Sequence, residues 1–252
     1  MEVHKHPHHI SHKKRFGEYL LEFLMLFLAV YLGFLAENVR EINVEKHREK
    51  QYMGSMVRDL ELDTIFFSSV LKYNRNKINL IDSVIVFFGL NTGEKVPVQI
   101  YQDAFSLIKS NSFFQNSGTI EQLKNSGGLR LVRQRIVVDS IQAYDQQMRR
   151  LVIRDKLEVD ESIKDIDLLQ KVFDGEMLTK LYVDSLYKKS SFHPGSLVSV
   201  NRRALGEYLN HLIEYRFLMD ADIKLRDRIA ARATNLLLLI QKSYHLKNGE
   251  QE

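Results

Sequence analysis

The histidines near the N-terminus are the residues whose type and spacing come closest to a metal site. Five of the 9 histidines stand in the first twelve residues, as His4, His6, His8, His9 and His12. Neutral imidazoles bind Zn²⁺ or Ni²⁺, and donors this close in sequence can share one ion. A tail outside a folded domain, however, lacks the surrounding groups that hold metal ligands in place. We therefore favour a basic, titrating tail beside anionic lipid, and we predict no cofactor.

Elsewhere, the side chains capable of acid–base chemistry do not form a catalytic pattern. His211 and Glu207 stand one helical turn apart, which is the spacing of an ordinary surface contact. The acidic clusters Asp59–Asp63 and Asp220–Asp222 alternate along expected helices, so we interpret them as solvated faces. The chain has 0 Cys and no nucleophile motif, phosphate-binding glycine loop or calcium loop. We expect that the protein is not an enzyme.

One turn in the sequence suggests anion binding. Thr119 and Gln122 have the spacing of a capping box. Ser126, Gly127 and Gly128 then end the short helix, and such a turn can present free backbone amides to an anion. Two adjacent glycines more often mark a tight connection that needs positive φ, and both interpretations stay open.

A hydrophobic run near the N-terminus indicates a membrane span. The 18 residues from Tyr19 to Ala36 read YLLEFLMLFLAVYLGFLA, with Glu22 as the one charge. As an α-helix they extend about 27 Å, which is enough to cross the hydrocarbon of a bilayer. The run is apolar on every face after Glu22 and lacks a signal-peptide cleavage site. We therefore predict a transmembrane helix over residues 16–37.

The flanks of the predicted span suggest its orientation. Lys13, Lys14 and Arg15 abut the apolar run, whereas the other side begins with Glu37 and leads to a large domain. A large domain can be translocated regardless of its charge. We predict that residues 1–15 form a cytoplasmic tail and that the domain after the span lies outside the cytoplasm.

One face of the predicted span carries its only carboxyl and all of its small residues. These residues follow steps of four, three, four and three along the helix: Glu22, Leu26, Ala29, Gly33 and Ala36. Small residues let helices approach closely, and an intramembrane carboxyl usually faces a partner or water. We predict that this face forms a homo-oligomeric seam or lines a pore. The alternative is that Glu22 simply reaches headgroup water.

Beyond the span, the composition favours long helices. Only 3 Pro and 12 Gly occur in 252 residues, and helix breakers are therefore scarce. Residues 38–52 mix charges at helical spacing and are predicted to form a polar neck. Glu37 is the last residue of the predicted span, and Asn38, Arg40 and Glu41 follow it at the start of the neck.

The rest of the chain has the pattern of a helical domain. Residues 53–246 contain apolar stripes with a period near 3.6, in three long runs and several short ones. The predicted fold class is all-α, with one N-terminal transmembrane helix that continues into an elongated antiparallel helical bundle. Asn201 is the expected N-cap of the last helix. Residues 247–252 are expected to be a disordered tail.

The charge balance argues against nucleic acid as a partner. The chain has 36 basic and 32 acidic residues, and its net charge of +4 leaves a mixed surface. Nucleic-acid-binding domains usually carry a stronger basic excess on one face. We predict a lipid bilayer, further copies of the chain and an envelope protein as partners.

Two stretches are similar to a known family. They are FLAVYLGFLAENVREINVEKHREKQYMGSMVRDLELDT, Phe27–Thr64, and TIEQLKNSGGLRLV, Thr119–Val132. These stretches resemble an uncharacterised family of small single-span membrane proteins from Bacteroidota. The resemblance implies an anchored helical protein in the inner membrane of a two-membrane bacterium, with its domain in the periplasm. It implies no catalytic residue.

These observations lead to three hypotheses about function. The first is a membrane-anchored, self-associating interaction or scaffold protein of the bacterial envelope. The second is an oligomeric channel lined by the Glu22 face. The third is a periplasmic sensor whose bundle binds a ligand.

Overall fold

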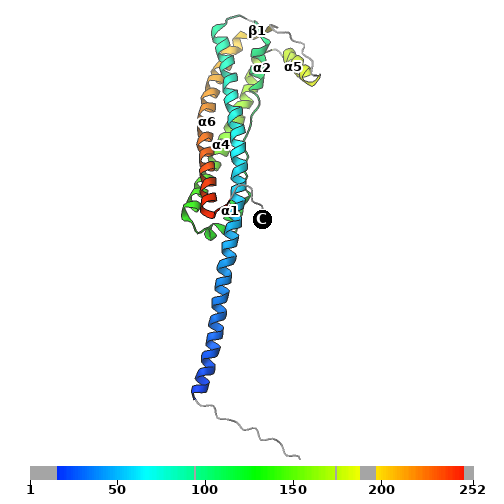
Figure 1. Cartoon of the computed structure of the whole chain (residues 1–252). Helices are drawn as coiled ribbons and strands as arrows, with labels where there is room; N and C mark the ends of the chain where they lie inside the picture. The colour runs from blue at the N-terminus through cyan, green and yellow to red at the C-terminus, as the bar shows by residue number, and fades with distance from the viewer. Residues whose placement is uncertain (1–15, 94, 174, 188–196, 247–252) are drawn as a thin grey trace, which may run out of the picture. The chain divides into compact units, whose positions relative to one another are not determined.

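The computed structural model describes residues 16–93, 95–173, 175–187 and 197–246. In this part of the chain the elements, in order, are α1 Phe16–Leu90, β1 Lys95–Pro97, α2 Val98–Ser106, α3 Gly118–Asn125, the 3₁₀ helix η1 Gly128–Leu131, α4 Arg135–Val172, α5 Gly175–Tyr187, β2 Leu197–Ser199 and α6 Arg202–Tyr244. The predicted all-α class with three long helices is confirmed (Figure 1). The predicted tails, 1–15 and 247–252, lie outside the described residues.

The chain divides into two compact units between Gln51 and Tyr52. The described part of the first unit is the N-terminal part of α1, and every side chain from Phe16 to Val44 is exposed. It contains the apolar segment, which is long and apolar enough to cross a membrane and is 0% buried within the protein. In the neck, the Arg40 guanidinium donates to the Glu37 carboxylate, with Nε 2.8 Å from Oε2.

The second unit is a bundle of three long helices, formed by residues 52–90 of α1 together with α4 and α6 (Figure 1). Helix α6 runs antiparallel to both others. Along α1 the pairs are Asn74 with Asp222 and Asp82 with Arg216. Along α4 the pairs are Arg154 with Leu218, Lys164 with Glu214 and Lys171 with Glu207. The predicted bundle is therefore present, but α1 and α4 run parallel, as the pairs Asp63 with Tyr144 and Lys77 with Ser162 show.

The segment between α2 and α3 explains why α1 and α4 are parallel. This segment runs antiparallel to α1, so residue numbers rise along the segment as they fall along α1. The Lys109 carbonyl accepts from Lys77, the Phe113 ring stacks on Phe67 at 4.0 Å, and the Thr119 amide donates to Asp59. After this return, α4 starts from the end of the bundle where the second unit begins.

Two apolar clusters form the core of the second unit. The first packs Met53, Leu60 and Val70 of α1 against α4 and α6, up to Ile240. The second lies around Ile81 and Val84 and includes the aromatic side chains Tyr101, Phe173, Tyr208 and Tyr215. Burial of these side chains supplies most of the driving force for folding. Between the two clusters, core positions on all three long helices carry polar residues.

Two short segments far apart in the sequence pair with each other as a small β-ribbon. Strands β1 and β2 are antiparallel, with Lys95 opposite Ser199 and Pro97 opposite Leu197, and Phe173 forms a bridge with Val200. Strands of three residues are too short for a readable alternation of apolar and polar residues. For this reason the two strands could not be predicted from the sequence.

The start of α3 differs from the sequence prediction, whereas the start of α6 does not. The expected capping box is wrong: the N-cap is Ser117, and Thr119 is buried with its amide bonded to Asp59. A partner from another helix has replaced the local cap. At α6 the Asn201 side chain accepts from the Arg203 amide, so the predicted N-cap is confirmed.

Asp63 ties three parts of the second unit together. Its carboxylate is 1% exposed and accepts from the Asn116 amide at 2.8 Å, the Asn116 side chain at 2.8 Å and the Tyr144 hydroxyl at 2.6 Å. Burial and the neighbouring charge of Asp63 raise the pKa of Tyr144. The interpretation of this acidic cluster as a solvated face was therefore wrong for Asp63.

Removing this carboxylate should destabilise the fold. We expect Asp63→Ala to lower the free energy of unfolding by about 3 kcal/mol, because the Asn116 amide and the Tyr144 hydroxyl lose their acceptor. Urea unfolding in detergent, followed by circular dichroism, measures the change. The control is Asp139→Ala, since Asp139 is exposed on α4; equal losses for the two variants would contradict the structural role of Asp63.

Candidate functional site

The polar residues between the two apolar clusters form the candidate site. We call them the buried polar network, and its members are Asn74, Lys77, Asp155, Glu158, Ser162, Asp165, Tyr208, His211, Tyr215, Asp222 and Arg226. On α4 and α6 these residues recur at steps of three, four or seven, so each helix directs its set toward the bundle interior. They occupy positions that continue the apolar stripes of their helices.

Arg226 is the centre of one half of the network. Its side chain is 0% exposed, and its guanidinium donates to Asp222 on its own helix and to Asp155 on α4. The Asn74 side chain donates to Asp222 at 3.2 Å and the Phe113 amide donates to Asp155 at 3.2 Å. Burial alone would lower the pKa of Arg226, but the two carboxylates raise it overall. The guanidinium is therefore a fixed buried cation.

Lys77 is the centre of the other half. Its ammonium group donates to the Lys109 carbonyl at 2.6 Å and lies 3.6 Å from Glu158 Oε1. It also lies 4.8 Å from the centre of the Tyr215 ring, whose hydroxyl is 2.9 Å from Ser162 Oγ. Burial lowers the pKa of Lys77 and raises the pKa of Glu158.

His211 lies between two carboxylates of α4, of which Asp165 belongs to the network and Glu161 does not. Its ring is 2% exposed, with Nδ1 3.4 Å from Glu161 and Nε2 3.5 Å from Asp165. The expected surface pair of His211 with Glu207 was therefore wrong, because Glu207 lies beside Lys171 instead, at 3.7 Å. Both imidazole nitrogens face carboxylate oxygens from α4.

The network contains more acidic than basic groups. Four carboxyl residues, Asp155, Glu158, Asp165 and Asp222, are less than 10% exposed, and the basic residues beside them are Lys77, His211 and Arg226. Asp165 is 0% exposed, and burial raises its pKa, although His211 and Lys77 act in the opposite direction. In a medium of low dielectric constant, an excess of negative charge favours proton uptake. The chemistry that this arrangement supports is the binding and release of protons.

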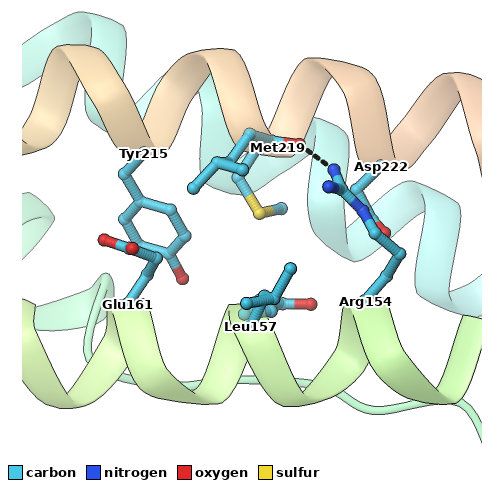
Figure 2. Close-up of a pocket in the computed structure, with 8 residues that line it drawn as sticks. Arg154, Leu157, Glu161, Tyr215, Met219 and Asp222 are labelled. Atoms are coloured by element: carbon cyan, nitrogen blue, oxygen red, sulfur yellow. Dashed lines mark hydrogen bonds between the residues drawn. The ribbon is translucent and has the colours of Figure 1, made fainter.

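A narrow pocket between α4 and α6 leads to the network (Figure 2). The space open to the centre of a water molecule is about 10 Å³, and its lining includes Glu158, Glu161, Tyr215 and Asp222. Above these residues the Arg154 guanidinium donates to the Leu218 carbonyl, at 3.4 Å. The side chains leave room for a molecule about the size of water. A single water molecule therefore fits beside Glu158 and Asp222.

No known protein family, curated protein or solved structure matches this chain. The resemblance of Phe27–Thr64 and Thr119–Val132 to a Bacteroidota family therefore stays a prediction. Within the described ranges, no group of three or more His, Asp or Glu residues has the geometry of a metal site. The histidine tail lies outside those ranges.

The structure keeps the predicted residues of the span together. Glu22, Leu26, Ala29, Gly33 and Ala36 all belong to α1 and share one face of it. In the neck, Glu37 and Arg40 form an exposed pair, and Asn38 and Glu41 are exposed beside them. Whether the face meets another copy of the chain stays a prediction.

The predicted anion-binding residues do not converge. Thr119 lies near the start of α3, whereas Ser126 caps its end, so the two are separated by about 10 Å of helix. Ser126 Oγ donates to the Gln122 carbonyl at 2.6 Å, and Gly127 has the positive φ of 67° that a tight turn needs. An anion here would also meet the negative end of the α3 dipole. The geometry is that of a connection.

Sequence reasoning missed the buried polar network. The signal was present, because Asp155, Glu158 and Asp165 continue the helical spacing of Tyr144, Met148 and Leu151 on α4. An acidic residue at such a position is exposed in most helices, since burying it needs a partner. The partners lie on α1 and α6, far away in sequence.

Loss of the central cation should destabilise the bundle strongly. We expect Arg226→Met to lower the free energy of unfolding by about 3–5 kcal/mol, because Asp155 and Asp222 stay buried without their partner. The matched control is Arg228→Met, which removes an exposed arginine two residues away and should change it by less than about 0.5 kcal/mol. Urea unfolding of the full chain in detergent distinguishes them; similar values would show that Arg226 is not a buried ion.

The raised pKa of Asp165 predicts a pH dependence of defined sign. Between the ordinary carboxyl pKa of about 4 and neutrality, the folded chain holds this proton more tightly than the unfolded chain, so Asp165 reduces stability as the pH rises. Asp165→Asn should therefore be more stable than the natural chain at pH 7, and its advantage should shrink as the pH falls toward about 4.

The control for this prediction is Asp167→Asn, an exposed residue on the same helix. Its stability difference from the natural chain should not change over this range of pH. An advantage of Asp165→Asn that grows toward acid pH would mean that the Asp165 pKa is lowered, contrary to the prediction.

Proposed function

We propose that this chain is a membrane-anchored, self-associating protein of the bacterial envelope whose helical bundle binds other proteins. The observation that carries the proposal is the apolar segment of α1, which is 0% buried within the protein. An apolar surface of this extent is rare in a soluble monomer. Insertion into lipid removes it from water and also satisfies every backbone group within the helix.

The flanking residues support an orientation with the N-terminus in the cytoplasm. Basic residues are equally numerous on the two flanks, but Lys13, Lys14 and Arg15 abut the apolar run, whereas the other flank begins with Glu37 and leads to a large domain that can be translocated regardless of its charge. The bundle then lies in the periplasm, attached to the inner membrane. This location agrees with the family resemblance of Phe27–Thr64.

Self-association is proposed through the face that carries Glu22 and Gly33. Small residues permit close approach of two helix backbones, and a second copy offers the carboxyl a polar neighbour within the membrane. If several copies surround water instead, the same face lines a pore. Conductance in reconstituted bilayers would then support the channel alternative.

The acid–base groups of the bundle are buried, whereas large apolar side chains are exposed, and this distribution favours an interaction role. The acid–base groups of the network face one another, and the pocket that reaches them is narrow. The outer surface, in contrast, exposes large apolar side chains, among them Phe217 at 67% and Ile153 at 65%. Exposed aromatic and aliphatic side chains are the usual anchors of protein interfaces.

The sensor hypothesis is supported by one specific observation. Asp165 and Glu158 are buried with raised pKa values, so the bundle responds to the proton itself. A sensor would need the change in protonation to alter the outer surface of the bundle. If partner binding by the bundle does not depend on pH between about 4 and 7, the sensor alternative is contradicted.

The membrane proposal predicts the result of extraction. The full chain should stay with the membrane pellet after washing at alkaline pH, because a spanning helix is held by the hydrophobic effect and not by charge. Release of the chain into the supernatant would contradict anchoring.

Self-association can be tested in the same membranes by disulfide formation, because the natural chain contains 0 Cys. We expect Gly33→Cys to form a dimer on oxidation, since it lies on the proposed seam. The matched control is Tyr31→Cys, on the opposite face of the helix. Monomer alone, or equal dimer from both positions, would contradict the seam.

A further inference from the structure

One end of the second unit is formed by three stretches that contain no acidic residue. They are residues 52–58, 125–138 and 229–246. The basic residues in these stretches are Arg58, Arg130, Arg133, Arg135, Arg232 and Lys242. Residues 64–81 also contain basic but no acidic residues, so these three stretches form a local excess of positive charge only where the fold brings them together. The nearest acidic residues in sequence, Asp59 and Asp139, come directly after two of the stretches.

The fold brings these stretches together. Met53, Val132, Val137 and Ile240 belong to one apolar cluster, and the Gln134 side chain donates to the Ser243 carbonyl at 3.1 Å. Figure 1 shows the C-terminal end of α6 beside the start of α4. We call this surface the basic end. It is also the end at which the chain enters the second unit, at Tyr52.

The basic end presents its charges and some apolar side chains to solvent. All six basic residues are exposed. Between them, Ile136 is 62% exposed near the start of α4, and Leu238 is 56% exposed near the end of α6. Arginine side chains interspersed with exposed aliphatic ones match a surface that is anionic outside and apolar below, which is the headgroup region of a bilayer.

We propose that the basic end binds the anionic headgroups of the membrane in which the chain is anchored. The inference rests on the proposed anchoring, because residues 37–51 are the only chain between the apolar segment and Tyr52. As a helix they extend about 22 Å. These few residues tether the bundle to the membrane in which the chain is anchored, so the bundle cannot move far from the headgroups. An acidic protein surface would meet the same charges but would lack this tether.

The experiment uses the full chain in vesicles and a fluorescent label on one introduced cysteine. Ile136→Cys carries an environment-sensitive dye at the basic end, and Leu90→Cys carries it at the opposite end of the bundle, where Leu90 is 80% exposed. Nitroxide-labelled headgroups report contact by quenching. We expect quenching at position 136 in vesicles with phosphatidylglycerol but not in pure phosphatidylcholine, and none at position 90. Salt at about 0.5 M should reverse it, because the charges are exposed.

Charge variants test which residues make the contact. The combined variant Arg130→Gln, Arg133→Gln and Arg135→Gln should lose the quenching at position 136. The control variant Arg150→Gln, Lys156→Gln and Lys171→Gln removes the same charge from exposed positions away from the basic end and should keep it. Circular dichroism verifies that both variants are folded.

The outcomes separate this inference from the proposed function. Retention of the chain in alkali-washed vesicles with no quenching in anionic lipid would overturn headgroup binding while anchoring stands, and the basic end would then face an acidic protein. Quenching that is equal in neutral lipid, or that survives the loss of the three arginines, would also overturn it. A chain that does not insert at all contradicts the anchoring on which both rest.

Discussion

A guanidinium can be buried in a helical bundle only where carboxylates meet it directly, because an unpaired buried charge costs several kcal/mol. Arg226 is 0% exposed and satisfies this constraint with Asp222 from its own helix and Asp155 from α4. If either helix slipped by one turn, the charge would lose one of its partners. Apolar side chains tolerate alternative packing more easily. The pairing of Arg226 therefore fixes how α4 and α6 lie against each other.

The same constraint extends to the rest of the second unit. Lys77 brings α1 into the network. Its ammonium group also donates to the Lys109 carbonyl, which belongs to the returning segment. That segment is what allows α1 and α4 to run in the same direction. Burial raises the pKa of Glu158 and of Asp165 in this network, so the folded bundle favours their protonated forms more than the unfolded chain does. Stability and protonation of this bundle are thus linked.

The sequence predicted the long helices well, because their apolar stripes extend over many turns. The Asn201 cap of α6 was predicted correctly from local residues. The buried polar network was not predicted, since an acidic residue such as Asp155 looks the same in sequence whether its partner is water or an arginine 71 residues away. Thr119 was misread for a related reason: Asp59, on another helix, takes the amide bond that a local cap would have made.

The measurement that tests the central constraint most directly is a double-mutant cycle between Arg226 and Asp155, in the full chain in detergent. The variants are Arg226→Met, Asp155→Leu and the two combined. If the pair is a buried ion pair, the combined variant should lose less stability than the sum of the two single losses, because Asp155 has no partner left to lose once Arg226 is removed. Losses that simply add would show that Arg226 and Asp155 do not depend on each other, and would contradict the account.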